Sequence, residues 1–129
     1  MENNNILHKV KQIVKNPDAI IDTYDLSFVF VSEKCCKLTE FSRDELVGNQ
    51  IFVMCQKYKE PCEIEINMQN DPPQERIIPI VTKSKKNIKF KIKSLGIKVE
   101  NYPYHVEKYL KLLNNYKKKF LNETPYFEK

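Results

Sequence analysis

Tryptophan is absent from the 129 residues of this chain, which also contains only two glycines and two histidines. Gly48 and Gly96 lie far apart, so there is no glycine-rich loop of the kind that cradles phosphate groups. His8 and His105 have no serine or carboxylate motif beside them that would indicate a catalytic triad. Because no set of titratable residues converges, we predict that the chain is not an enzyme.

Long apolar runs are missing as well. No stretch approaches the roughly 20 apolar residues that a membrane-spanning helix needs. The opening Met-Glu-Asn-Asn-Asn lacks the apolar segment of a signal peptide. We therefore expect a protein of the cytoplasm or the nucleus with no membrane partner. A chain of this length with 41% hydrophobic and 30% charged residues is typical of one globular domain.

The four cysteines, Cys35, Cys36, Cys55 and Cys62, include no Cys-x-x-Cys pair. Without a secretory signal, we expect them to be free thiols rather than a disulfide framework. Both histidines lie far from them in the sequence, so the spacing does not fit a zinc site. We predict no metal.

Charge is distributed unevenly along the chain. Residues 1–75 carry 8 basic and 13 acidic side chains, whereas residues 76–129 carry 14 basic and 4 acidic ones. Such a basic half is compatible with an acidic partner or nucleic acid. The simpler alternative, a solvated lysine surface, is favoured because no nucleic-acid-binding motif accompanies the charge.

The most specific local pattern is a short capped helix. Ser42 followed by Glu45 forms a capping box, and Phe41 with Leu46 supplies a hydrophobic staple around it. Gly48 can adopt the left-handed conformation that ends a helix. The pattern predicts a helix from about residue 43 to residue 47.

A strand and another short helix precede this motif. Residues 28–31 form a β-branched and aromatic run, and Cys35, Cys36 and Leu38 follow in a helical pattern. The whole stretch, 28–48, resembles the first half of a PAS domain. The positions that agree with the family pattern are Leu38, Thr39, Phe41, Ser42, Arg43, Glu45, Leu46 and Gly48, whereas Glu40 replaces a glycine.

The resemblance extends over about residues 18–112 and implies an α+β fold. We expect a five-stranded antiparallel sheet with short helices on one face and a helix at each end, in residues 1–17 and 113–129. Strands are predicted at residues 18–23 and 77–82. Residues 88–93 alternate strictly between apolar side chains and lysines, which is a strand pattern, and 95–98 resembles the strand that follows it.

Two segments have alternative interpretations. In residues 49–75 the family has helices that cover the sheet, and 51–59 can supply a turn, but 63–68 alternates like a strand. Residues 104–112 fit either a last strand or one face of a helix that starts at Pro103. We favour a strand that passes into a helix near residue 111.

An apolar stripe marks the first helix, which we expect to end at Asn16-Pro17. In the PAS family such a helix packs on the sheet or forms a dimer interface. Because the sequence indicates no obvious partner for the stripe in the core, we predict a homodimer or a complex with another signalling protein. The predicted interface consists of Ile6, Val10, Ile13 and Val14.

The resemblance raises the question of a cofactor. Flavin-binding photosensors of the family carry an adduct-forming cysteine where this chain has Ile51, and Cys55 comes four residues later. Haem-binding members use a histidine that residues 49–75 lack. Both observations argue against these cofactors, while a chromophore linked to Cys55 or Cys62 stays open.

The function implied is a sensory or protein-interaction module in signal transduction or transcriptional regulation. A small apolar ligand is one option for the core, although simple packing is the commoner role of such residues. The expected lining of the pocket comprises Ile20, Val29, Val31, Phe41, Leu46, Phe52, Met54, Ile78, Ile80, Phe90 and Ile92. The alternative function is binding of nucleic acid or an acidic partner through the lysine-rich half.

Overall fold

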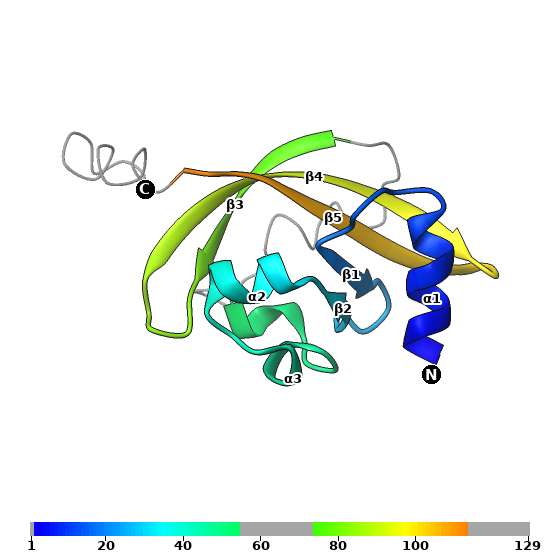
Figure 1. Cartoon of the computed structure of the whole chain (residues 1–129), viewed down its shortest axis with the longest axis horizontal. Coiled ribbons are helices and arrows are strands. Elements are labelled where there is room, and N and C mark those ends of the chain that lie inside the picture. The colour runs from blue at the N-terminus through cyan, green and yellow to red at the C-terminus, as the bar shows by residue number, and fades with distance from the viewer. Residues whose placement is uncertain (1, 55–73, 114–129) are drawn as a thin grey trace.

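A computed structural model describes residues 2–54 and 74–113 of the chain (Figure 1). It contains a five-stranded antiparallel sheet in the order β2-β1-β5-β4-β3, which confirms the predicted fold class. The strands are β1 (Ala19–Asp22), β2 (Phe28–Val31), β3 (Gln74–Val81), β4 (Asn87–Val99) and β5 (Tyr102–Leu112). The helices are α1 (Glu2–Lys11), α2 (Glu33–Thr39), α3 (Arg43–Leu46) and the 3₁₀ helix η1 (Ile51–Met54).

The two faces of the sheet are covered by different helices. The long strands β4 and β5 arch over α2 and α3, whereas α1 stands near the turn that joins β4 to β5 (Figure 1). We call the face that packs on α2, α3 and η1 the inner face; Ile21, Phe90, Ile92 and Tyr109 belong to its core. The opposite, outer face packs on α1 through Val10, which contributes to a second cluster with Ile20, Val99, Tyr104 and Val106.

The capped helix forms as its sequence predicts. The Glu45 amide donates to Ser42 Oγ over 3.2 Å, and the Ser42 amide donates to Glu45 Oε1 over 2.9 Å. Leu46 is fully buried, and Phe41 packs at the edge of the same cluster. Gly48 has φ +90°, a left-handed conformation in which a side chain would be strained. The helix therefore starts and stops through its own local chemistry.

Removing this cap should weaken the fold measurably. We expect Ser42→Ala to lower the free energy of unfolding by about 0.5–2 kcal/mol, because the Glu45 amide loses its acceptor. Ser42→Gly is the matched control, since glycine at an N-cap costs only a few tenths of a kcal/mol. Urea denaturation measures both; a Ser42→Ala variant that unfolds at the same urea concentration as the parent would argue against the role of the cap.

Glu40 occupies the position where the family pattern has a glycine. Its φ of +72° ends α2 in the left-handed region, which is unfavourable for a residue with a side chain. The Ser84 amide donates to Glu40 Oε1 over 3.0 Å, and Lys86 Nζ lies 3.3 Å from Oε2. The Ser84 hydrogen bond lowers the Glu40 pKa to about 2. Glu40 thus ties the end of α2 to the β3–β4 turn.

Three boundaries differ from those expected. The first helix ends at Lys11, before Asn16-Pro17, because a turn of residues 12–16 comes between them. Residues 87–99 form one continuous strand instead of two. The helical interpretation of 104–112 is wrong: β5 pairs with β1 and with β4 and stays extended to Leu112. The strand pattern at 63–68, one of the two alternatives for that segment, lies outside the described residues, as does all of the helix expected at 113–129 except residue 113.

Candidate functional site on the inner face

Most of the residues predicted to line a pocket lie together on or beneath the inner face. One buried cluster contains Val31, Leu46, Met54, Ile78, Ile80, Phe90 and Ile92, and Phe41 is partly buried against it. The side chain of Phe52 lies outside the description. The structure thus groups these residues, and their role in holding a ligand stays a prediction.

Ile20 and Val29 are exceptions, because both belong to the cluster on the outer face. The reason is strand alternation: Ala19 and Ile21 point inward from β1, so Ile20 between them points toward α1. The pairing of β1 with β2 also shifts its register between Ile20 and Ile21. These two residues are therefore removed from the predicted lining.

Polar side chains interrupt the apolar inner face on three adjacent strands. His105 and Glu107 lie two residues apart on β5 and therefore share its inner face. Ser94 on β4 lies opposite Glu107. Arg76 reaches this region from β3, where it pairs with Ile92. Ser94, His105 and Glu107 are 0%, 1% and 2% exposed, respectively. We call Arg76, Ser94, His105 and Glu107 the inner polar group.

Asp18, which lies next to this group, has its hydrogen bonds satisfied. Ser32 Oγ donates to Asp18 Oδ1 over 2.7 Å, and the Tyr109 amide donates to Oδ2 over 2.8 Å. The Asp18 amide in turn donates to the Glu107 carbonyl over 2.9 Å. Asp18 therefore joins β1, the start of α2 and β5, which is a structural role.

The inner polar group differs from Asp18 in its hydrogen bonding. Within the part of the chain that the structure describes, buried atoms of three of its members have no hydrogen-bond partner. These atoms are the three guanidinium nitrogens of Arg76, the Ser94 hydroxyl oxygen and Glu107 Oε2. Each buried atom of this kind lowers the free energy of unfolding by about 1–3 kcal/mol, and by more when it is charged, unless it forms a hydrogen bond.

Burial dominates the electrostatics of the group. It raises the Glu107 pKa to about 8; the charge of Arg76 opposes this shift and that of Asp18 adds to it. His105 Nε2 lies 3.7 Å from Glu107 Oε2. A neutral Glu107 can donate a hydrogen bond, while Arg76 offers only donors. The group therefore presents several donors and one positive charge.

The neighbouring aromatic and thiol groups are inert by comparison. Tyr109 stacks on Phe90 with 5.0 Å between the ring centroids, and its pKa is raised well above 10 mainly by burial. Burial also raises the Cys35 pKa to about 12. Because the thiolate is the reactive form, this cysteine should not act as a nucleophile. Cys35 and Cys36 are free thiols, as expected; Cys55 and Cys62 lie outside the described residues.

The sequence did not predict the inner polar group, because residues 104–112 lack the alternation of a strand with one buried face. As the central strand, β5 is buried on both faces, with Tyr104 and Val106 outward and His105, Glu107 and Tyr109 inward. The sequence did contain one signal, which is the charged residue Glu107 in a strand whose other face is apolar. Lys98, Lys91 and Lys93 on β4 are exposed, unlike Glu107.

The four residues of the predicted dimer interface take different positions. Val10 is fully buried on the outer face, and Ile6 and Val14 are partly buried against the same cluster. Ile13 is 61% exposed. The outer face of the sheet thus covers most of the apolar stripe of the first helix. Self-association stays a prediction, and it depends mainly on the exposed Ile13.

Comparisons with known proteins give structural relatives. No protein-family model matches the sequence, and no curated protein matches it. Among solved structures, the PAS domain of an HTR-like protein from Haloarcula marismortui is 11% identical, with a TM-score of 0.56. That match covers 84% of this chain and 98% of the other.

Two further structures are similar. The dark-state LOV domain of the blue-light photoreceptor Aureochrome1 is 17% identical over 91% of this chain and 90% of its own, with a TM-score of 0.63. The PAS-B domain of Drosophila melanogaster Cycle, solved with ethylene glycol, is 12% identical over 71% and 97%, with a TM-score of 0.55. The chain therefore has a PAS-like fold, as its resemblance in residues 28–48 indicated.

The expected absence of a flavin adduct can be tested at η1. Ile51, 5% exposed, occupies the position of the adduct-forming cysteine, and an alkyl side chain cannot add to a flavin. We expect blue light to cause no reversible bleaching of flavin absorbance in the purified protein. A photobleach that Cys55→Ala abolishes would show instead that the nucleophile is displaced along the chain.

Proposed function

We propose that this chain is a sensory or protein-interaction module that reads a small molecule at the inner polar group. The observation that carries the proposal is the set of buried polar atoms in this group that have no hydrogen-bond partner among residues 2–54 and 74–113. It modifies the expectation of a purely apolar ligand, because a molecule that fits here needs polar atoms. We propose no catalytic role for the chain.

Folding alone does not explain why charged groups are buried here. Replacing buried charged groups by apolar ones of similar size is often neutral or stabilising. The Arg76 guanidinium on β3 and Glu107 Oε2 on β5 have no hydrogen-bond partner among the described residues, so packing of the core alone would not favour them. A bound molecule that accepts from Arg76 and exchanges hydrogen bonds with Ser94 and Glu107 would supply the missing partners.

Native mass spectrometry tests the proposal. The full chain is incubated with a small-molecule extract of cells, desalted and measured under native and denaturing conditions. We expect a mass excess that is present in the native spectrum and lost on denaturation. Arg76→Met should abolish it, because the charged donor is removed.

Arg43→Met is the matched control, since Arg43 is the other arginine of the chain and lies by Phe30, away from the inner polar group. It should retain the bound mass. Absence of any mass excess in the parent, or equal retention by Arg76→Met, would contradict the proposal.

A further inference from the structure

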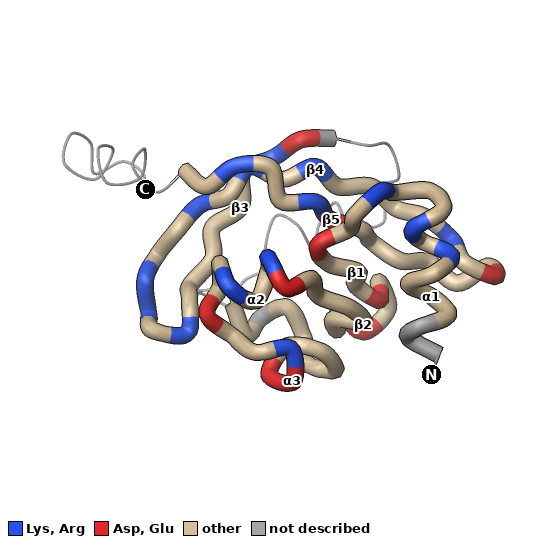
Figure 2. The backbone as a smooth tube through the Cα atoms, in the orientation of Figure 1, with Lys and Arg blue, Asp and Glu red and all other residues tan. Residues whose placement is uncertain are grey.

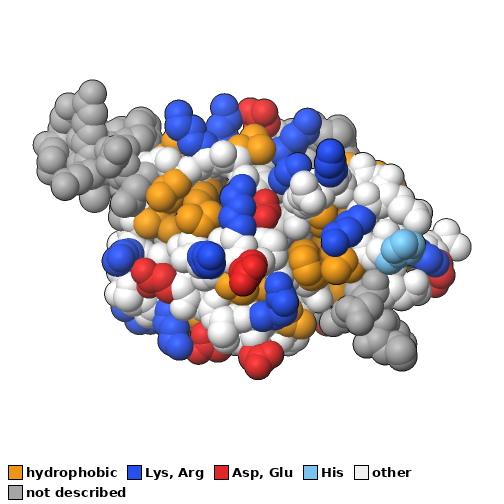
Figure 3. Space-filling model, in the orientation of Figure 1, with side chains coloured by type: hydrophobic (Ala, Val, Ile, Leu, Met, Phe, Trp, Pro, Cys, Tyr) orange, Lys and Arg blue, Asp and Glu red, His pale blue; other side chains and the backbone are white. Residues whose placement is uncertain are grey.

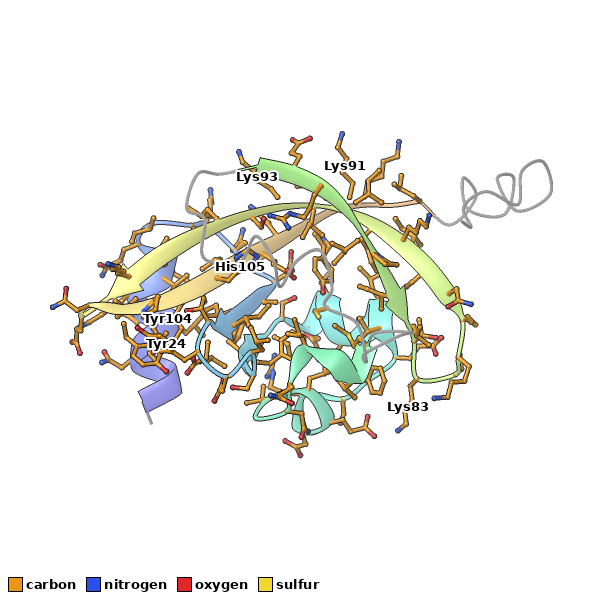
Figure 4. All side chains as sticks on the ribbon, turned by 180° about the vertical axis from the view of Figure 1, so that it is seen from behind. Tyr24, Lys83, Lys91, Lys93, Tyr104 and His105 are labelled. Atoms are coloured by element: carbon orange, nitrogen blue, oxygen red, sulfur yellow. The ribbon has the colours of Figure 1, made fainter. Side chains whose placement is uncertain are left out.

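Lysines gather on a part of the outer face that α1 leaves uncovered. Strand alternation places Lys89, Lys91 and Lys93 of β4 on this side, together with Lys108 of β5. Lys111 of β5 joins them because the register shifts between Lys91 and Ile92, which makes Lys111 the partner of Lys91. In Figure 4, Lys91 and Lys93 project from the sheet on the side away from α2 and α3. Figure 2 shows the corresponding basic positions along β4 and β5. We call these five residues the lysine face.

Like charges face each other directly across the strands there. Lys93 is the cross-strand neighbour of Lys108, and Lys91 that of Lys111. Like-charged residues directly opposite each other destabilise an antiparallel pair. Two such pairs in succession work against folding, although Glu75 on β3 lies opposite Lys93 on its other side. Unfavourable pairs of this kind are expected where the surface is used for binding.

Two contacts tie lysines of this face to the rest of the described chain. Lys91 Nζ lies 3.3 Å from Glu75 Oε1, and both side chains are about half exposed, so the pair contributes little. Lys108 Nζ donates to the Lys15 carbonyl over 2.8 Å. Neither contact removes the net positive charge of the face.

Apolar side chains lie among these lysines. Ile77 is 49% exposed and is the cross-strand neighbour of Lys91, and exposed Pro79 is that of Lys89. The space-filling view shows lysine and arginine side chains along the upper edge of the molecule, with apolar and acidic side chains among them (Figure 3). The surface therefore combines positive charge with contact area for apolar groups.

From this combination we infer that the lysine face docks an acidic amphipathic segment of another protein, whose carboxylates meet the lysines and whose apolar side chains cover Ile77 and Pro79. A second copy of the same face would oppose lysines to lysines. The chain's own residues 114–129 carry four lysines and two glutamates, so they do not complement the face either. Nucleic acid would satisfy the charge but would leave Ile77 without an apolar partner.

The inference is tested with two synthetic acidic peptides of equal charge. One is a helix-forming peptide with glutamates on one face and leucines on the other; the second has the leucines replaced by serines. Fluorescence anisotropy measures binding to the full chain. We expect the leucine peptide to bind at least tenfold more tightly than the serine peptide, with affinity falling as salt increases.

The matched variants separate binding from folding. Lys93→Gln/Lys111→Gln should weaken peptide binding at least tenfold while its melting temperature equals or exceeds that of the parent, because two repulsive pairs are relieved. Lys37→Gln/Lys98→Gln removes the same charge from exposed sites outside the face and should bind like the parent.

Three results would overturn the inference. They are equal binding of the two peptides, unchanged binding by Lys93→Gln/Lys111→Gln, and tighter binding of a mixed-sequence oligonucleotide than of the leucine peptide. The last result would assign the face to nucleic acid. None of these outcomes bears on the proposed small-molecule site, because the inner polar group lies on the opposite side of the sheet.

Discussion

Asp18→Ala is expected to lower the free energy of unfolding by about 3–5 kcal/mol, because two hydrogen bonds to a buried carboxylate are lost. The Tyr109 amide and the Ser32 hydroxyl both donate to this carboxylate, from β5 and from the cap of α2. Asp18 itself is only 5% exposed, so water does not readily replace it. Chemical denaturation followed by circular dichroism measures the loss.

Asp44→Ala is the control for this variant. Asp44 is exposed at the start of α3, and its removal should cost less than 1 kcal/mol. If Asp18→Ala and Asp44→Ala unfold alike, the three elements are not joined at Asp18 as described.

Stability should fall as the pH rises from about 4.5 to about 8. The folded chain keeps the proton of Glu107 up to a pKa of about 8, whereas the unfolded chain releases it near the ordinary value of 4.5. Within this window the unfolded state binds fewer protons, so the free energy of unfolding decreases with pH. At about 1.4 kcal/mol for each pKa unit, the expected loss is several kcal/mol.

Glu107→Gln provides the control, since the amide has the same shape and does not ionise. Its unfolding free energy should change much less between pH 5 and pH 8.5, and the two curves should converge at the acidic end apart from a constant offset. A parent protein whose stability rises across this window while that of Glu107→Gln stays level would contradict the burial of a neutral carboxyl group.

The first half of the fold could be predicted from the sequence because its elements depend on local interactions. The capping box at Ser42 and Glu45, the strand at residues 28–31 and the stop at Gly48 each depend on neighbours within a few residues. These elements appear where the pattern predicts them. The family resemblance then placed them in a five-stranded antiparallel sheet, which the structure contains.

The candidate site was predicted less well because it depends on register between distant strands. Ile20 was assigned to the wrong face, since β1 is apolar on both faces and its own sequence does not distinguish Ile20 from Ile21. Glu107 and Ser94 meet only because β4 and β5 pair at one particular register. Burial on both faces of β5 also removed the alternation that would have distinguished its inward side chains.

If the inner polar group is kept for recognition rather than for packing, its replacement by apolar residues should not destabilise the folded chain, and the stability of Arg76→Met/Glu107→Leu tests this most directly. We expect urea denaturation at pH 7.5 to show a midpoint equal to or above that of the parent, because unpartnered buried polar groups are replaced by apolar ones of similar size. A midpoint well below that of the parent would mean that Arg76 and Glu107 stabilise the folded chain without a ligand. This result would contradict the proposal that they are kept to bind a small molecule.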